Sequence, residues 1–206
     1  MNFEALLNAL KKKWWVVISS IIVLALAAVI VTWQMPQKYD AGSTATAIRG
    51  TNIKQTDVDY YLYDNYYAIQ SGAFIADNIV SWLASPPAVA AIYKDANIDL
   101  PPSNLRALSK IFAAKKQSAS SNVITFTTAN TDSDKAYKLI TSANKYLTQL
   151  VAEINKDQKD EGSHFSVYFS EPVVVKVPKS YALNTLVAAF LGLVIGTAIA
   201  VYRPDK

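Results

Sequence analysis

The sequence predicts an α+β fold: two transmembrane helices flank an extracytoplasmic domain with a small mixed sheet and packed helices. Three observations support this prediction. Two charge-free apolar segments lie near the ends of the 206-residue chain. Between them, several short stretches with loosely alternating polar and apolar residues predict strands. One further stretch carries apolar residues at spacings of three and four, which predicts a long amphipathic helix packed on the sheet.

The two apolar segments cover residues 14–33 and 181–202, and neither contains a charged residue. Each reaches the roughly 20 residues that a helix needs to cross about 30 Å of hydrocarbon. Each also begins and ends with Trp or Tyr, side chains that are enriched at membrane–water interfaces. We therefore expect both to span a membrane. The first is longer than the roughly 7–15 apolar residues of a signal peptide, so we expect it to remain as an anchor.

The charges that flank the spans predict their orientation. Lys11–Lys13 precede the first span, and Arg203 and Lys206 follow the second. Because basic residues beside spans tend to stay in the cytoplasm, we expect cytoplasmic tails at 1–13 and 203–206. The domain at 34–180 then lies outside the cytoplasm.

The charge balance limits the partners that we expect. Residues 34–180 hold 15 Lys+Arg and 14 Asp+Glu, so the net charge of the chain, +4, comes mostly from the tails. Tail lysines can contact anionic membrane lipid. The basic residues form no patch beyond the N-terminal cluster, so we expect no nucleic-acid partner. The chain contains no cysteine, which excludes disulfides and thiolate metal sites.

The central domain is predicted to combine three or four strands with several helices. Its first and last strands adjoin the spans, so we expect the sheet to lie close to the bilayer. Thr131 and Asp134 resemble a capping box at the start of the long helix. The predicted strands are 38–48, 110–117, 122–128 and a last one through 164–169 and 172–177; the predicted helices run from the tyrosine-rich stretch to about Leu83, over 88–98, and over 134–156.

The sequence offers little catalytic chemistry. His164 is the single histidine, so a site with several histidine ligands is excluded. Asp57 and Asp59 would point about 200° apart on a helix and so do not converge. Asp132 and Asp134 are better explained by helix capping, and no P-loop or nucleophile elbow is present. We therefore expect no catalytic residue, no cofactor, no metal site and no enzymatic activity.

Two features predict assembly instead. Gly192, Gly196 and Ala200 form a ridge of small residues that lets membrane helices approach closely. We interpret this ridge as an oligomer interface, while packing against the first span of the same chain is the alternative.

The second feature is the tyrosine-rich stretch 57–67. On a helix, Tyr60, Tyr63, Tyr66 and Tyr67 fall within an arc of about 120°. A second arc contains Ile75, Ile79, Trp82 and Leu83 and can pack on the sheet. We interpret the tyrosine arc as a contact between subunits, because aromatic residues are enriched in interfaces. A platform for a sugar and local packing within the monomer remain as alternatives.

The layout resembles the Wzz-type polysaccharide co-polymerases, or chain-length determinants. The resemblance covers most of the chain: the Lys-rich start and first span, "YDA" (Tyr39–Ala41), and the proline-containing segment "PVVVKVP" before the Gly-containing second span. That segment has Pro172 and Pro178, fewer prolines than is usual in the family. The strand and helix around "DSDKA" are the most specific part. Two longer stretches also match, "DNIVSWLASPPAVAAIYKDANIDL" and "NVITFTTANTDSDKAYKLITSANKYL".

The resemblance implies a non-catalytic scaffold that forms homo-oligomers and regulates the chain length or export of a polysaccharide. The polysaccharide would be an O-antigen of lipopolysaccharide, a capsule or an exopolysaccharide. The membrane would be a bacterial inner (plasma) membrane, with the domain at 34–180 periplasmic or extracellular. Short members act with a separate cytoplasmic tyrosine kinase, and the short C-terminal tail leads us to expect no fused kinase. A polysaccharide polymerase and direct contact with the glycan are further partners that the resemblance implies. An extracytoplasmic sensor, an assembly subunit of another membrane complex and a membrane-bound glycan enzyme remain as alternatives.

Overall fold

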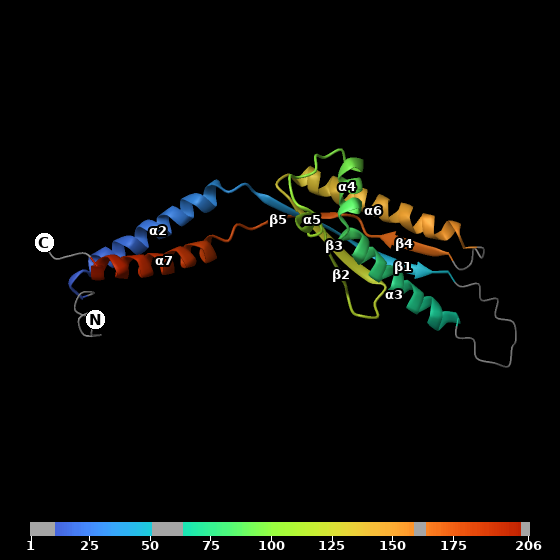
Figure 1. The fold of residues 1–206 in the computed structure, drawn as a ribbon, viewed down its shortest axis with the longest axis horizontal. Helices are drawn as coiled ribbons and strands as arrows, with labels where there is room; N and C mark the ends of the chain where they lie inside the picture. The colour runs from blue at the N-terminus through green and yellow to red at the C-terminus, as the bar shows by residue number, and fades with distance from the viewer. Residues whose placement is uncertain (1–10, 51–63, 159–163, 203–206) are drawn as a thin grey trace. The chain divides into compact units, whose positions relative to one another are not determined.

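The computed structural model describes residues 11–50, 64–158 and 164–202 (Figure 1). The chain divides into two compact units. One unit combines the two terminal segments, Met1–Gln37 and Pro178–Lys206, and the other is the intervening segment Lys38–Val177.

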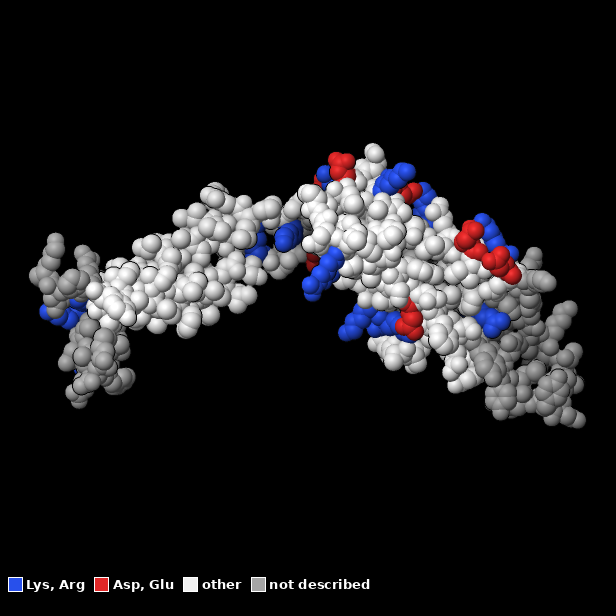
Figure 2. Space-filling model, viewed as in Figure 1, with Lys and Arg blue, Asp and Glu red and all other residues white. Residues whose placement is uncertain are grey.

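The first unit is a pair of antiparallel helices, α2 (Trp14–Gln34) and α7 (Tyr181–Tyr202). Both are long and apolar enough to cross a membrane, and Figure 2 shows no charged atoms along most of their length. The Asn184 amide donates a hydrogen bond of 3.0 Å to the Thr32 hydroxyl. Gly196 approaches α2 near Val17, at the other end of the pair. Since later residues of α7 meet earlier residues of α2, the helices run in opposite directions.

The second unit contains a five-stranded sheet in which β1 lies centrally. The strand order is β2-β3-β1-β4, and β5 also pairs with β1. The strands are β1 (Lys38–Arg49), β2 (Ala113–Lys116), β3 (Val123–Asn130), β4 (Phe165–Phe169) and β5 (Val173–Val177).

Every strand pair is antiparallel, so the predicted mixed sheet is wrong. The connection from β1 through the helices does bring β2 back in the same direction as β1. The hairpin of β2 and β3 then places β3 between β1 and β2. Strands that run the same way are therefore never neighbours in this sheet, and the sheet has one strand more than the three or four expected.

The strands β4 and β5 share one edge of β1 and form an interrupted single strand. Phe169 pairs with Ala45, and Val173 pairs with Gly42. Three residues, 170–172, thus face two residues of β1, which is the geometry of a β-bulge. Ser170 keeps the bulge attached, because its backbone and its hydroxyl both bond to Thr44 at 2.9 Å.

Helices cover one face of the sheet. Alternate residues of β1 and β3 are buried, including Ala45, Ala47, Ile124 and Phe126, while their neighbours in sequence are more exposed. The core also contains Ile79 and Leu83 of α3, Ile92 of α4, and Leu139, Ile140 and Leu147 of α6. The helices are α3 (Asp64–Leu83), α4 (Pro86–Asp95), the single-turn α5 (Leu105–Leu108) and α6 (Ser133–Lys156).

The helix starts differ in detail from the sequence expectations. The helix predicted over 88–98 begins earlier, because Pro86 and Pro87 form the first turn of α4. A first-turn proline is tolerated because the backbone N–H that it lacks has no partner inside the helix. The cap of α6 is Asp132, whose Oδ1 accepts hydrogen bonds from the backbone N–H groups of Asp134 and Lys135. The predicted capping box of Thr131 and Asp134 is therefore wrong by one residue, although capping by Asp132 is confirmed.

Candidate functional site

The candidate site is the solvent-facing side of α3, on the sheet unit. Its inner side is buried in the core through Ile75, Ala76 and Ile79. Its outer side carries Tyr66, Ile69 and Phe74, which are 57%, 67% and 69% exposed. Apolar side chains of this size are rarely so exposed in a contiguous group on a soluble surface unless something binds them.

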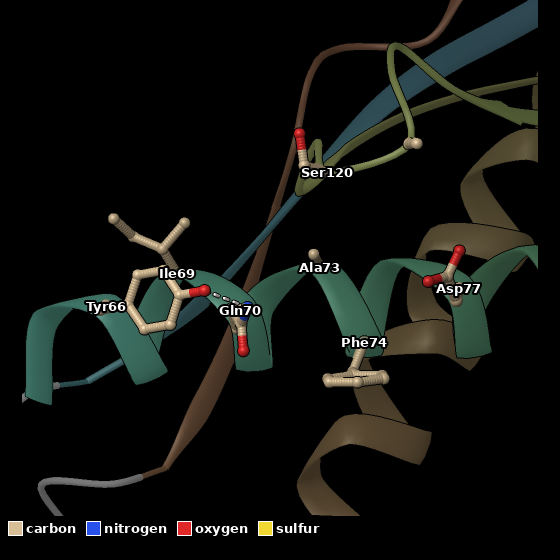
Figure 3. Close-up of a pocket in the computed structure, with 8 residues that line it drawn as sticks. Tyr66, Ile69, Gln70, Ala73, Phe74, Asp77 and Ser120 are labelled. Carbon is tan, nitrogen blue, oxygen red and sulfur yellow. Dashed lines mark hydrogen bonds between the residues drawn. The ribbon is translucent and has the colours of Figure 1, made fainter. Parts of the chain in front are cut away.

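A shallow pocket of about 450 Å³ lies on this side of α3. Figure 3 shows its α3 residues following one another along the helix, with Ser120 supplied by the loop between β2 and β3. We call this group the α3 outer surface; it consists of Tyr66, Ile69, Gln70, Ala73, Phe74, Asp77, Ala119 and Ser120.

Three of the four polar side chains on the α3 outer surface bond within the protein. The Gln70 amide donates a hydrogen bond of 2.8 Å to the Tyr66 hydroxyl (Figure 3). Asp77 pairs with Lys116 of β2 at 3.0 Å, and the same ammonium donates to the Ala73 carbonyl at 3.3 Å. The two contacts of Lys116 hold α3 to β2. Most of the area that the surface offers to a partner is apolar.

The structure describes the side chain of only one of the four tyrosines that were predicted to form an interface. Tyr66 lies on the α3 outer surface. Tyr67 belongs to α3, and its side chain lies outside the described part of the structure, as do Tyr60 and Tyr63 entirely. The second predicted arc is confirmed as the core side of the helix, since Ile75, Ile79 and Leu83 are buried and Trp82 packs against the core.

Ile69, Gln70 and Phe74 were missed by sequence reasoning, which followed the tyrosines alone. A signal for them exists. Ile69, Ala73 and Asp77 follow Tyr66 at spacings of three and four, so they continue its line along the helix. The contribution of Ser120 has no local signal, because it depends on the loop between β2 and β3 lying over α3.

The ridge of small residues on α7 contacts α2 of the same chain. Gly192, Gly196 and Ala200 are buried in that contact. A Cβ at Gly192 would lie 2.7 Å from the Ile21 Cα, and one at Gly196 would lie 2.8 Å from the Val17 Cα. The alternative of packing against the first span is thus the arrangement found. A subunit contact through this ridge would require α2 to leave α7.

His164, Pro172 and Pro178, which the sequence analysis also named, lie next to the ends of β4 and β5. The half-buried His164 places its Nε2 3.3 Å from the Gln158 carbonyl oxygen, just before β4. Pro172 lies in the bulge before β5, and Pro178 follows β5 directly. Asp57 and Asp59 lie outside the described residues. Across residues 11–50, 64–158 and 164–202, no cluster of three or more His, Asp or Glu side chains could hold a metal ion.

No protein-family model matches the chain, and no curated protein matches it significantly.

Proposed function

We propose that this chain is a membrane scaffold without catalytic groups of its own, which assembles into homo-oligomers and regulates the chain length or export of a bacterial surface polysaccharide. Its partners in the plasma membrane would be a polysaccharide polymerase or a separate cytoplasmic tyrosine kinase. Both termini would be cytoplasmic, with the sheet unit on the outer side.

The α3 outer surface is the observation that carries the assembly part of this proposal. It combines exposed Tyr66, Ile69 and Phe74 with few polar side chains, most of which already bond within the protein. A sugar needs free donors and acceptors for its hydroxyls, whereas a protein partner gains from covering apolar area. The surface therefore favours a second copy of the chain over a glycan as its occupant.

The connection between sheet and helices supports a scaffold role. Residues 35–37 link α2 to β1, and residues 178–180 link β5 to α7. The strands β1 and β5 pair over Lys38–Gly42 and Val173–Val177. The two chain segments that enter and leave the helix pair are thus hydrogen-bonded to each other. An assembly of sheet units would also bring together the spans of neighbouring subunits.

The polysaccharide part of the proposal rests on the resemblance of the chain to the chain-length determinants. The stretches that support it correspond to structural elements: "NVITFTTANTDSDKA" forms β3 and the start of α6, and "PVVVKVP" contains β5. No catalytic signature takes part in this resemblance.

Deletion of the gene in its own bacterium tests the proposal. A regulator of chain length leaves polysaccharide synthesis running but changes the length distribution, which a sugar-stained gel displays. Re-expression of the chain should restore the original distribution. Loss of all polysaccharide, with only the lipid-linked precursor remaining, would point to an enzyme instead, and an unchanged distribution would remove the polysaccharide role.

A further inference from the structure

A second pocket, of about 360 Å³, lies where β1 begins and β3 ends. Its volume is within the roughly 300–1,000 Å³ range of small-molecule sites. Several segments of the sheet unit line it. Lys38 comes from the first position of β1, Tyr93 comes from α4, and 129–131 come from the end of β3; Pro101 and Ile111 complete the lining.

Tyr93 contributes a mostly buried side chain to this pocket. Only 6% of the residue is exposed, and it is one of the residues that line the pocket. Burial raises the pKa of the Tyr93 phenol above its ordinary value of 10.0, so the group stays protonated and can donate. A ligand that accepts a hydrogen bond from this phenol would gain binding energy from it.

The polar lining consists mainly of hydrogen-bond donors. Asn130 uses its Oδ1 to accept a hydrogen bond of 3.1 Å from the Asp132 backbone N–H, which leaves its amide N–H groups as donors. Lys38 adds a positive charge, and Thr131 adds a hydroxyl. None of the residues that line the pocket carries a carboxylate. A cation together with several neutral donors fits a group with several anionic oxygens, above all a phosphate.

The position of Lys38 in the chain limits where that phosphate can come from. Residues 35–37 alone separate Lys38 from the end of α2. Each residue of an extended chain adds at most about 3.6 Å, so Lys38 stays within about 15 Å of that helix end whatever the angle between the two units. If α2 crosses a membrane, the pocket has a phosphate-rich headgroup layer within reach.

We propose that this pocket binds the phosphate of an anionic phospholipid headgroup, held by Lys38, Tyr93 and Asn130. The inference goes beyond the polysaccharide role and stands without it, since it requires only that α2 crosses a membrane. Its effect would be to fix the base of the sheet unit at the lipid surface.

Asp40 allows a test in which the expected change in affinity is opposite to that for Lys38. It lies opposite Ala129 in the register of β1 and β3, so it places a carboxylate beside the pocket. A negative charge there opposes binding of an anion. Asp40→Asn should therefore tighten binding, whereas loss of Lys38 should weaken it.

The experiment uses the full-length protein in a non-ionic detergent, titrated with dioctanoyl phosphatidylglycerol and followed by native mass spectrometry. We expect Lys38→Gln and Tyr93→Phe each to raise the Kd about fivefold, the effect of losing one lysine contact or one hydrogen bond. Lys176→Gln is the matched control, because Lys176 lies at the same end of the sheet but does not line the pocket. Its Kd should stay at the wild-type value.

Two further measurements separate this proposal from simpler explanations. Tyr93→Phe keeps the ring and removes only the hydroxyl, so without lipid its Tm should equal or exceed that of the wild type. Dioctanoylglycerol, which lacks the phosphate, should not bind. The proposal is overturned if Lys38→Gln and Lys176→Gln bind the lipid equally, or if inorganic phosphate binds as tightly as the lipid, because the headgroup would then not be the ligand.

Discussion

The Lys145 ammonium of α6 donates a hydrogen bond to the Asp95 carboxylate at the end of α4. Hydrogen bonds from Lys145 and then from Ser142 lower the pKa of Asp95 below its ordinary value of 3.8. A carboxyl group with a lowered pKa in the folded protein stabilises it above the ordinary pKa. That contribution is lost as the pH falls through the folded value. The pair is exposed, so solvent weakens its effect.

This residue pair predicts a pH-dependent difference in stability. Asp95→Asn should lower the Tm slightly at pH 7, and the difference from the wild type should shrink as the pH falls below 3.8 and through the lowered pKa of the folded carboxyl group. Thermal melts between pH 7 and pH 2.5 measure this. Asp99→Asn, which changes an exposed carboxylate in the loop after α4, serves as the control. A difference that did not shrink between pH 7 and pH 2.5 would mean that Asp95 acts through packing instead of charge.

At the scale of single residues, the sequence predicted which types of side chain take part in a contact better than it predicted which atoms they bond to. Capping of α6 by a residue just before it was predictable from the Asp and Thr residues there. The choice of Asp132 over Thr131 depends on backbone angles at one position. The outward direction of Ile69 and Phe74 depends on which side of α3 the sheet buries, which a run of apolar residues on both sides leaves open.

Among the elements, the pair α2 and α7 is held by close packing and by one polar contact. Membrane helices associate mainly through van der Waals contact, which small residues permit by letting backbones approach. Gly192 and Gly196 face backbone atoms of α2, which cannot move aside as a flexible side chain can. Thr32 is buried, bonds to the Ala28 carbonyl, and accepts the bond from Asn184.

A large side chain in the ridge should separate the two helices of one chain. We expect Gly196→Leu to abolish the disulfide that Thr32→Cys and Asn184→Cys form under mild oxidation in the otherwise cysteine-free protein. Ala198→Leu, on an exposed position of α7, should leave that disulfide intact. Mobility on a non-reducing gel distinguishes a bond within one chain from one between chains. A disulfide that joined two chains would show instead that the ridge is a subunit contact.

Periodicity predicted most of the elements and little of their pairing. Hydropathy defined both long helices, alternation defined β1, and the apolar stripe of α6 defined its buried side. The sharing of one edge of β1 by β4 and β5 could not be predicted, because it depends on register between segments far apart in the sequence; Ser43 and Ser170, which bond at the bulge, are 127 residues apart. The placement of β3 between β1 and β2 is non-local for the same reason.

The whole molecule combines a pair of apolar helices, a sheet unit joined to it through β1 and β5, and an apolar surface on α3. Positive and negative side chains are interspersed on the visible face of the sheet unit (Figure 2), so no single-sign field there would keep copies apart. The central claim is that contact between copies through the α3 outer surface is what sets polysaccharide length. Assembly and length regulation should then be lost together.

The most direct test replaces the exposed apolar side chains without disturbing the core. Ile69→Ser with Phe74→Ser removes two side chains that lie largely in solvent, so the Tm should stay within a few degrees of the wild type. Gln70→Ser, a polar change on the same surface, is the matched control.

The variants are expressed in the deletion strain. Chemical cross-linking in membranes gives the size of the oligomer, and a sugar-stained gel gives the polysaccharide length distribution. The account predicts that the double variant loses the large cross-linked species and shows the length distribution of the deletion strain, while the control keeps both. Intact cross-linked oligomers, or a wild-type length distribution despite lost oligomers, would contradict it.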